Sequence, residues 1–145
     1  MIAAADIVAE ARSMVGTRFQ HQARLPGVAI DCAGVVICVA RNLGIVPPCF
    51  DVTAYPREAD GVSLLRWCRQ YMTQVEQADM QPGDVVAVVY DEHPGHLGIA
   101  CDYVHGGLSI VHASSVPGTM RVVETRLLFS QRMRFAAAFR LPGVG

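Results

Sequence analysis

The pattern of apolar and polar residues divides the chain into two halves of different character. In the first half, apolar residues recur at helical spacing before Gly16, from Ala33 to Leu43 and from Gly61 to Met72. Gly44 directly follows the second of these segments and is a typical residue to end a helix. The first half is therefore predicted to form three helices joined by loops.

The second half has the pattern of β-strands and opens with the turn signal Gln81-Pro82-Gly83-Asp84. Five segments are predicted strands: Val85 to Tyr90, Leu97 to Tyr103, Leu108 to Ala113, Met120 to Glu124 and Ala136 to Leu141. Because the helices come first and the strands second, we predict an α+β fold with an antiparallel sheet. The length of 145 residues is expected to form a single domain, residues 1–145.

Composition and charge narrow the class of protein. Apolar residues make up 52% of the chain and charged residues 17%, which is typical of a globular protein. The formal net charge of -1 leaves no strong basic excess, so neither nucleic acid nor an anionic membrane is an expected partner. No apolar run is long enough to cross a bilayer, and charged residues interrupt Met1 to Val15, so no signal peptide is expected. We therefore expect a cytoplasmic location after synthesis.

The five cysteines lack the closely spaced pairs of a zinc site or a disulfide framework, so no metal is expected. Most lie in apolar segments, where a cysteine acts as a small hydrophobic residue. Cys32 differs, because it stands where a loop gives way to a predicted helix. A helix N-terminus stabilises a thiolate and lowers its pKa; Asp31 can cap this helix, although its charge partly opposes the shift. Cys32 is therefore the candidate nucleophile.

Two histidines in the predicted strands are candidates to assist this thiol. His96 opens one strand beside small residues, and His112 lies in the strand expected to pair with it. A Cys/His pair whose imidazole is oriented by a third polar group is a general arrangement for nucleophilic catalysis. We predict Cys32 as nucleophile, His96 as base and His112 as the residue that orients His96.

The loop between these two strands decides which face of the sheet carries His112. A two-residue turn at Gly106-Gly107 would put His112 opposite Cys101, on the face away from His96. A three-residue loop with a bulge would put it opposite Ala100, on the same face as His96, and we favour this arrangement. Because Ala100 is then about 13 Å from His96 along a flat strand, twist or strand offset must bring the rings together.

Several segments that carry these residues occur in a recognisable order. They are Gly16-Thr17-Arg18-Phe19-Gln20-His21-Gln22, Asp31-Cys32-Ala33-Gly34-Val35-Val36, Gln81-Pro82-Gly83-Asp84-Val85, Gly95-His96-Leu97-Gly98-Ile99 and Val111-His112-Ala113, with a tail from Val122 to Gly143. In residue types and spacing they resemble the NlpC/P60 family, and more closely its phage tail-associated branch. The likeness covers nearly the whole chain and is weakest from Val46 to Met80.

This resemblance implies a papain-like α+β fold, in which Cys32 heads a helix packed on an antiparallel sheet that carries His96 and His112. It implies hydrolysis of the peptide stems of bacterial peptidoglycan, commonly beside a γ-linked D-glutamate and a diamino acid. The reaction would pass through a thioester and need no cofactor. Phage tail proteins would be further partners, and a phage tail a further location.

One position departs from the family pattern, because Phe19 stands where many members have a tyrosine near the active site. If that hydroxyl holds the substrate or the developing oxyanion, His21 or the backbone N–H of Cys32 would have to replace it. Phe19, His21 and Asp31 are therefore the candidate substrate-binding or oxyanion residues.

Two other functions fit the same residues. One is a structural component of a phage tail tip with weak or no catalysis, which the missing hydroxyl at Phe19 favours. The other is an amidase or acyltransferase with the same Cys/His chemistry, because a fold does not determine the acceptor.

Overall fold

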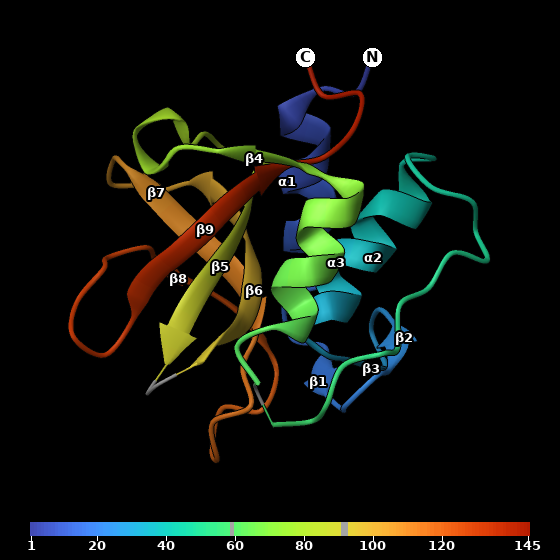
Figure 1. The fold of residues 1–145 in the computed structure, drawn as a ribbon, viewed down its shortest axis with the longest axis vertical. Helices are drawn as coiled ribbons and strands as arrows, with labels where there is room; N and C mark the ends of the chain where they lie inside the picture. The colour runs from blue at the N-terminus through green and yellow to red at the C-terminus, as the bar shows by residue number, and fades with distance from the viewer. Residues whose placement is uncertain (59, 91–92) are drawn as a thin grey trace.

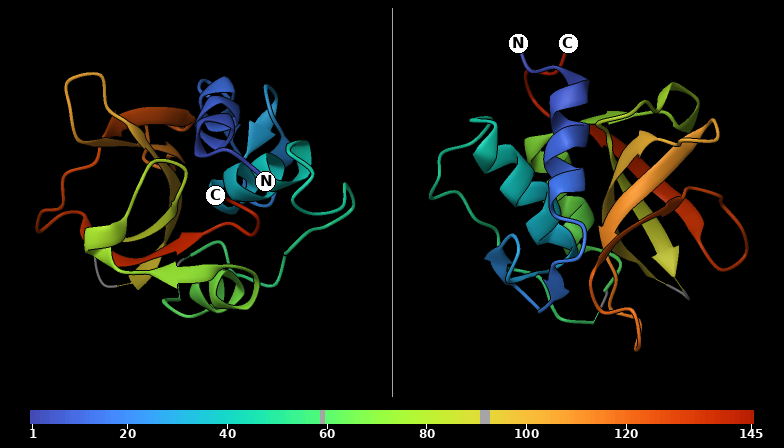
Figure 2. Two further views of the ribbon diagram at one scale, coloured as in Figure 1. Left: turned by 90° about the horizontal axis from the view of Figure 1, so that it is seen from above. Right: turned by 180° about the vertical axis from the view of Figure 1, so that it is seen from behind.

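The computed structural model describes residues 1–58, 60–90 and 93–145. In this part of the chain, three α-helices pack against one side of a six-stranded sheet (Figures 1 and 2). The helices are α1 (Ala4–Ser13), α2 (Cys32–Asn42) and α3 (Ser63–Tyr71). The three predicted helices and the α+β fold are thereby confirmed.

Within the described residues, the strands of the main sheet lie in the order β4-β9-β5-β6-β7-β8, and all neighbours are antiparallel. They are β4 (Thr73–Val75), β5 (Val85–Tyr90), β6 (His93–Asp102), β7 (Leu108–Ala113), β8 (Val122–Arg126) and β9 (Arg134–Arg140). The five predicted strands are present, but β6 begins before Leu97, so His96 lies inside the strand and not at its start. β4 and the short 3₁₀ helix η1 (Gln77–Asp79) were not predicted.

A second, smaller sheet leads into α2. It contains β1 (Arg18–Phe19), β2 (Arg24–Leu25) and β3 (Ala29–Ile30), in the order β1-β3-β2. Arg24 pairs with Ile30, and Phe19 pairs with the same residue from the other side. The segment before Cys32 therefore contains three short strands, although no strand was predicted in it.

Both faces of the main sheet are apolar, as alternate residues of β5 show. Val85 and Ala87 pack into the cluster shared with the helices, whereas Val86 and Val88 pack into a second cluster on the other face. All four are fully buried, and each buried valine contributes about 1.5 to 3 kcal/mol relative to an exposed one. Burial on both faces explains why β5 reads as a continuous apolar run and not as an alternating one.

The hairpin of β6 and β7 differs from the expected one. Asp102 pairs with Leu108, so the loop spans residues 103–107, five residues in place of three. Ala100 therefore faces Ile110, and the expected pairing of Ala100 with His112 is wrong by two positions. Continuing the same register places His112 opposite Gly98, two residues from His96 and on the expected face. The longer loop thus halves the separation along the strand, from four residues to two.

Gly98 makes room for this close pairing of β6 and β7. A Cβ added there would lie 2.5 Å from Cγ1 of Ile110 and 2.9 Å from the carbonyl oxygen of Val111. We therefore expect Gly98→Ala to lower the free energy of unfolding by about 1 to 3 kcal/mol and to reduce activity, because β7 must shift. Urea unfolding of the purified variant measures the first effect.

The matched control for this substitution is Gly98→Ala combined with Ile110→Ala, which removes the two closest side-chain atoms. The two changes together should cost less free energy than the sum of the single changes, because the clash with the Ile110 side chain is gone in the double variant and only the contact with the Val111 carbonyl remains. Additive costs, or a Gly98→Ala protein as stable as the wild type, would contradict the packing role of Gly98.

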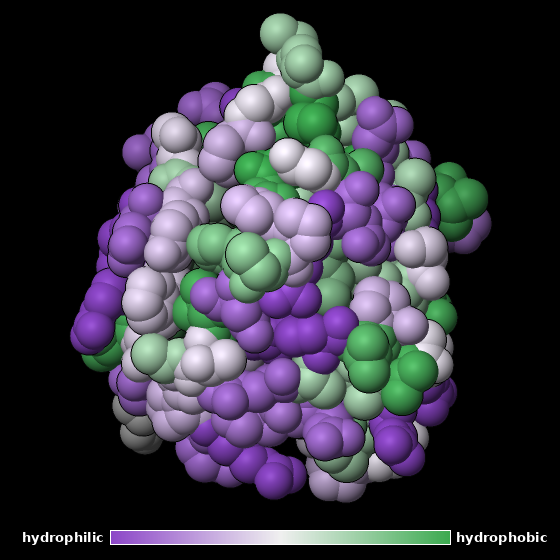
Figure 3. Space-filling model, turned by 90° about the vertical axis from the view of Figure 1, so that its right-hand side faces the viewer, coloured by the Kyte–Doolittle hydropathy of each residue, from purple (hydrophilic) through white to green (hydrophobic). Residues whose placement is uncertain are grey.

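The side of the molecule formed by α2 and the loop after it is a mosaic of polar and apolar side chains (Figure 3). The apolar groups on this side form separate small patches, which is normal for a protein surface exposed to water. No helix in the described residues combines the length and the apolar character that crossing a membrane would require.

Candidate active site

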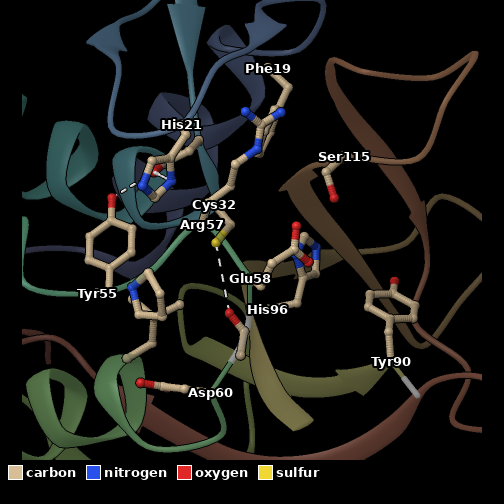
Figure 4. A pocket seen from close by; sticks show the side chains of 14 residues that line it. Phe19, His21, Cys32, Tyr55, Arg57, Glu58, Asp60, Tyr90, His96 and Ser115 are labelled. Carbon is tan, nitrogen blue, oxygen red and sulfur yellow. Dashed lines mark hydrogen bonds and ion pairs between the residues drawn. The ribbon is translucent and has the colours of Figure 1, made fainter. Parts of the chain in front are cut away.

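Cys32 and His96 border the same open cavity, with a volume of about 230 Å³, between the start of α2 and the sheet (Figure 4). Cys32 is the first residue of α2, as predicted, and is partly buried. The cavity wall comes from four parts of the chain that are distant in sequence. Its main lining residues are Phe19, His21, Asp31, Cys32, Tyr55, Arg57, Glu58, Asp60, Tyr90, His96 and Ser115.

His96 and His112 form a direct pair. Nε2 of His96 lies 2.6 Å from Nδ1 of His112, and the two rings meet edge to face. His112 is 7% exposed and buried, whereas His96 is partly exposed, so His112 is the inner ring of the pair. If His96 carries its proton on Nε2 and donates it to His112, then Nδ1 of His96 is left as an acceptor. This tautomer leaves a basic nitrogen for the thiol of Cys32.

Burial keeps both rings neutral near pH 7. It lowers the pKa of His96 to about 3, a shift to which the neighbouring His112 adds, and it lowers the pKa of His112 to about 4. Both histidines therefore lose their charge well below their ordinary pKa of 6.5, because an imidazolium is poorly solvated in this site.

The thiol of Cys32 is also neutral, which differs from the expected lowering of its pKa. Burial first, and the negative charge of Asp31 second, raise the pKa of Cys32 to about 11. Backbone N–H groups of Leu97 and Ala33 and the charge of Arg24 oppose this rise without cancelling it. The favourable field of the helix N-terminus is thus outweighed by desolvation, and the resting pair is a thiol and a neutral imidazole.

A β-bulge lies where the backbone of β6 comes next to Cys32. Val88 pairs with His96 and Val89 with Pro94, which leaves Gly95 as an extra residue in β6. The carbonyl oxygen of Gly95 lies 4.0 Å from Sγ of Cys32. No hydrogen bond joins Cys32 to His96 in the described part of the chain, and catalytic contacts of this kind often tighten only when substrate binds.

Asp31 is a structural residue at the back of the site. Its Oδ1 accepts from the backbone N–H of Gly34 at 2.7 Å and from Arg24 at 2.8 Å, which confirms the predicted cap of α2. Its Oδ2 accepts from the backbone N–H of Gln22 at 2.7 Å and from the hydroxyl of Tyr55 at 2.6 Å. These four bonds use the acceptor sites of a carboxylate, so little capacity is left for substrate.

The two other candidate binding residues both line the cavity. Phe19 is partly buried, packs against the main apolar cluster and has no polar group to offer. The side chain of His21 is 27% exposed, lies edge-on to Tyr55 and has Nδ1 4.0 Å from Oδ2 of Asp31. Of these residues, His21 is therefore the one with a side-chain donor at the cavity surface.

Sequence reasoning missed Arg24 and Tyr55, as well as the charged cavity residues Arg57 and Glu58. A single arginine or tyrosine in a loop has no periodicity to mark it, and residues 55–60 lie in the stretch where the family resemblance was weakest. The hydroxyl of Tyr55 does not replace the one missing at Phe19, because it donates to Asp31 and accepts from Arg24 at 2.6 Å. In the described residues, no group of three or more acidic, histidine or cysteine side chains is placed to hold a metal ion.

Comparison of the sequence with known family models and with curated proteins gives no match. Solved structures do share the fold. NlpC1 from Trichomonas vaginalis has a TM-score of 0.67 and 16% identity, covering 93% of this chain and 42% of that protein. The NlpC/p60 domain of the peptidoglycan hydrolase SagA has a TM-score of 0.64 and 22% identity, covering 97% of this chain and 100% of the domain.

A third similar structure is an N-acetylmuramoyl-L-alanine amidase from Bacteroides uniformis, with a TM-score of 0.64 and 10% identity, covering 95% of this chain and 98% of the amidase. The chain spans less than half the length of NlpC1. At these identities the likeness is one of fold. The chain has the papain-like α+β fold of NlpC/P60 domains.

Proposed function

We propose that this protein is a cysteine endopeptidase that hydrolyses the peptide stems of bacterial peptidoglycan. The observation that carries the proposal is that Cys32, at the start of a helix, and His96 line one open cavity, while His96 is hydrogen-bonded to the buried His112. Nucleophile, base and orienting group are the three parts that an activated thiol requires. The names of similar structures, a peptidoglycan hydrolase and an amidase, support the substrate class.

The neutral resting pair suggests the order of proton transfers. As Sγ of Cys32 attacks the carbonyl carbon, Nδ1 of His96 takes the thiol proton. His96 then gives this proton to the leaving amine, and a thioester remains on Cys32. In the second half, His96 takes a proton from water, hydroxide attacks the thioester, and this proton passes to the sulfur as the carboxylic acid product leaves. The product then loses its remaining proton to solvent. His112 accepts the Nε2 hydrogen bond of His96 throughout.

The charges around the cavity suit a stem peptide with free carboxylates and an amine. Arg57 lines the cavity and forms no salt bridge within the described residues, so its guanidinium can receive a substrate carboxylate. Glu58 supplies a negative charge on the same wall. The expected scissile bond lies beside a γ-linked D-glutamate and a diamino acid. These two residues carry the carboxylates and the amine. We assign stabilisation of the developing oxyanion to the backbone N–H of Cys32 and to the side chain of His21.

Digestion of defined muropeptides, with product masses read out, tests this function. We expect two fragments whose masses place the cut within the peptide stem. We also expect activity to survive EDTA and to be lost after alkylation of Cys32, because the chemistry belongs to the thiol. Folded wild-type protein that leaves every muropeptide intact would contradict the proposal and favour a structural tail-tip role.

An amidase is the second candidate, favoured by the similarity in fold to the Bacteroides uniformis amidase. The same digestion separates the two, because an amidase releases the whole peptide stem from the sugar. Transfer of the stem to an added amine would indicate an acyltransferase. The association with phage tails rests on the sequence segments alone and stays a prediction.

A further inference from the structure

We propose that Arg24 is a positioning residue of this site: it balances the charge of Asp31 directly behind Cys32 and holds the 51–55 segment, which ends in the cavity residue Tyr55. The catalytic part of this proposal rests on the proposed function, whereas its effect on Cys32 does not. The observation behind it is a polar network, buried except at Asp51, that joins β2, the start of α2 and the loop before α3.

All five N–H donors of Arg24 have partners. Nε binds Oδ1 of Asp51 at 2.9 Å, and Nη1 binds the carbonyl of Ala23 at 3.0 Å and Oδ1 of Asp31 at 2.8 Å. Nη2 binds the carbonyl of Val52 at 3.0 Å and the hydroxyl of Tyr55 at 2.6 Å. Only 9% of the Arg24 side chain is exposed. Such complete use of a guanidinium fixes the positions of its partners.

The network links the cavity wall to the nucleophile. Tyr55, which lines the cavity, donates to Asp31 while it accepts from Arg24. Asp31 caps α2 one residue before Cys32. Without Arg24, the charge of Asp31 next to the sulfur would lose its countercharge, and the segment that carries Tyr55 would lose its contacts at 51, 52 and 55. Both changes would hinder attack by the thiol.

Site-resolved alkylation of the folded protein with iodoacetamide tests the charge role and needs no substrate. Mass spectrometry gives the rate at each cysteine near pH 9, with exposed Cys49 as internal reference and buried Cys38 and Cys101 as reporters of unfolding. We expect Arg24→Met to slow Cys32 about threefold to tenfold, since a lost countercharge disfavours the thiolate. Arg24→Lys should stay within about twofold of wild type because the charge remains.

Two further variants distinguish a charge effect from general damage. Asp31→Asn should label faster at Cys32 than wild type, and Arg24→Met with Asp31→Asn should return close to the wild-type rate. The control is Arg41→Met, because Arg41 also binds this loop, through the carbonyl of Phe50 at 2.7 Å and Asp51 at 3.8 Å, yet has no bond to Asp31. Its rate at Cys32 should be unchanged.

Besides Asp31 and Tyr55 of the network, the charged and titratable groups that share the cavity with Cys32 are His21, Arg57, Glu58, Asp60, Tyr90 and His96, and these variants keep all six. Cys68 of α3 also lies close enough to interact with the charge of Cys32, and it too is kept. Equal rates at Cys32 in Arg24→Met and wild type, with Cys38 and Cys101 still protected, would overturn the charge role. So would a double variant as slow as Arg24→Met.

The positioning role has its own readout in kcat/KM on a muropeptide. Arg24→Lys keeps the charge but cannot reproduce five donors in one plane, so kcat/KM should fall about tenfold or more while alkylation of Cys32 stays near normal. An Arg24→Lys protein with a normal kcat/KM and a normal alkylation rate at Cys32 would overturn the positioning role. Absence of turnover in the wild type would instead contradict the proposed function, and the alkylation series would still be decisive.

Discussion

Replacing Cys32 by alanine is expected to lower kcat/KM on a muropeptide by roughly four orders of magnitude or more, because the attacking atom is removed. His96→Ala should be nearly as severe, since the neutral thiol then has no base to take its proton. His112→Ala should cost less, and His112→Asn less again, because an amide oxygen can still accept the Nε2 hydrogen bond of His96. The order of severity among the four variants identifies the roles.

These variants are compared after circular dichroism has shown that each is folded. His105→Asn is the matched control, because His105 is an exposed loop residue outside the cavity, and its kcat/KM should equal that of the wild type. The role assignment would be reversed by a His112→Asn protein as inactive as His96→Ala together with an active His112→Ala. Near-normal turnover in Cys32→Ala would remove the thiol mechanism altogether.

Acidification is expected to destabilise the folded protein before it protonates His96. The two rings have folded pKa values of about 3 and about 4, against 6.5 when unfolded. The unfolded chain therefore binds more protons, and the stability contributed by the neutral rings is full above about pH 6.5 and falls as the pH drops below it. Between pH 7 and pH 5 this loss is on the order of 1 to 2 kcal/mol for each ring.

Urea unfolding at a series of pH values measures this loss. A protein with both His96→Asn and His112→Asn should show a much flatter dependence of unfolding free energy on pH over the same window. His105→Asn should keep the wild-type slope, because His105 lies in an exposed loop away from the His96–His112 pair. An unchanged slope in the double variant would mean that other groups carry the acid sensitivity.

Local sequence patterns predicted the three helices and five strands of the main sheet, and they singled out Cys32 as the candidate nucleophile. Helical periodicity ending at Gly44 predicted α2, and the position of Cys32 at its start followed from the change from loop to helix. The strands were predicted by β-branched runs and glycine turns. Each of these signals acts between residues a few positions apart, so it can be recognised without knowing where distant segments lie.

The chemistry of the site depended on contacts that only the tertiary structure could decide. The five-residue loop set the register that joins His96 to His112, and one more or one fewer residue would have turned His112 to the other face. Burial reversed the expected pKa shift of Cys32, because desolvation depends on packing around the helix start and not on the helix alone. Likewise, Asp31 was saturated by Arg24 and by Tyr55, which comes from a loop 24 residues further along the chain. Register, burial and hydrogen-bond partners arise from distant segments meeting in space, and no local pattern records them.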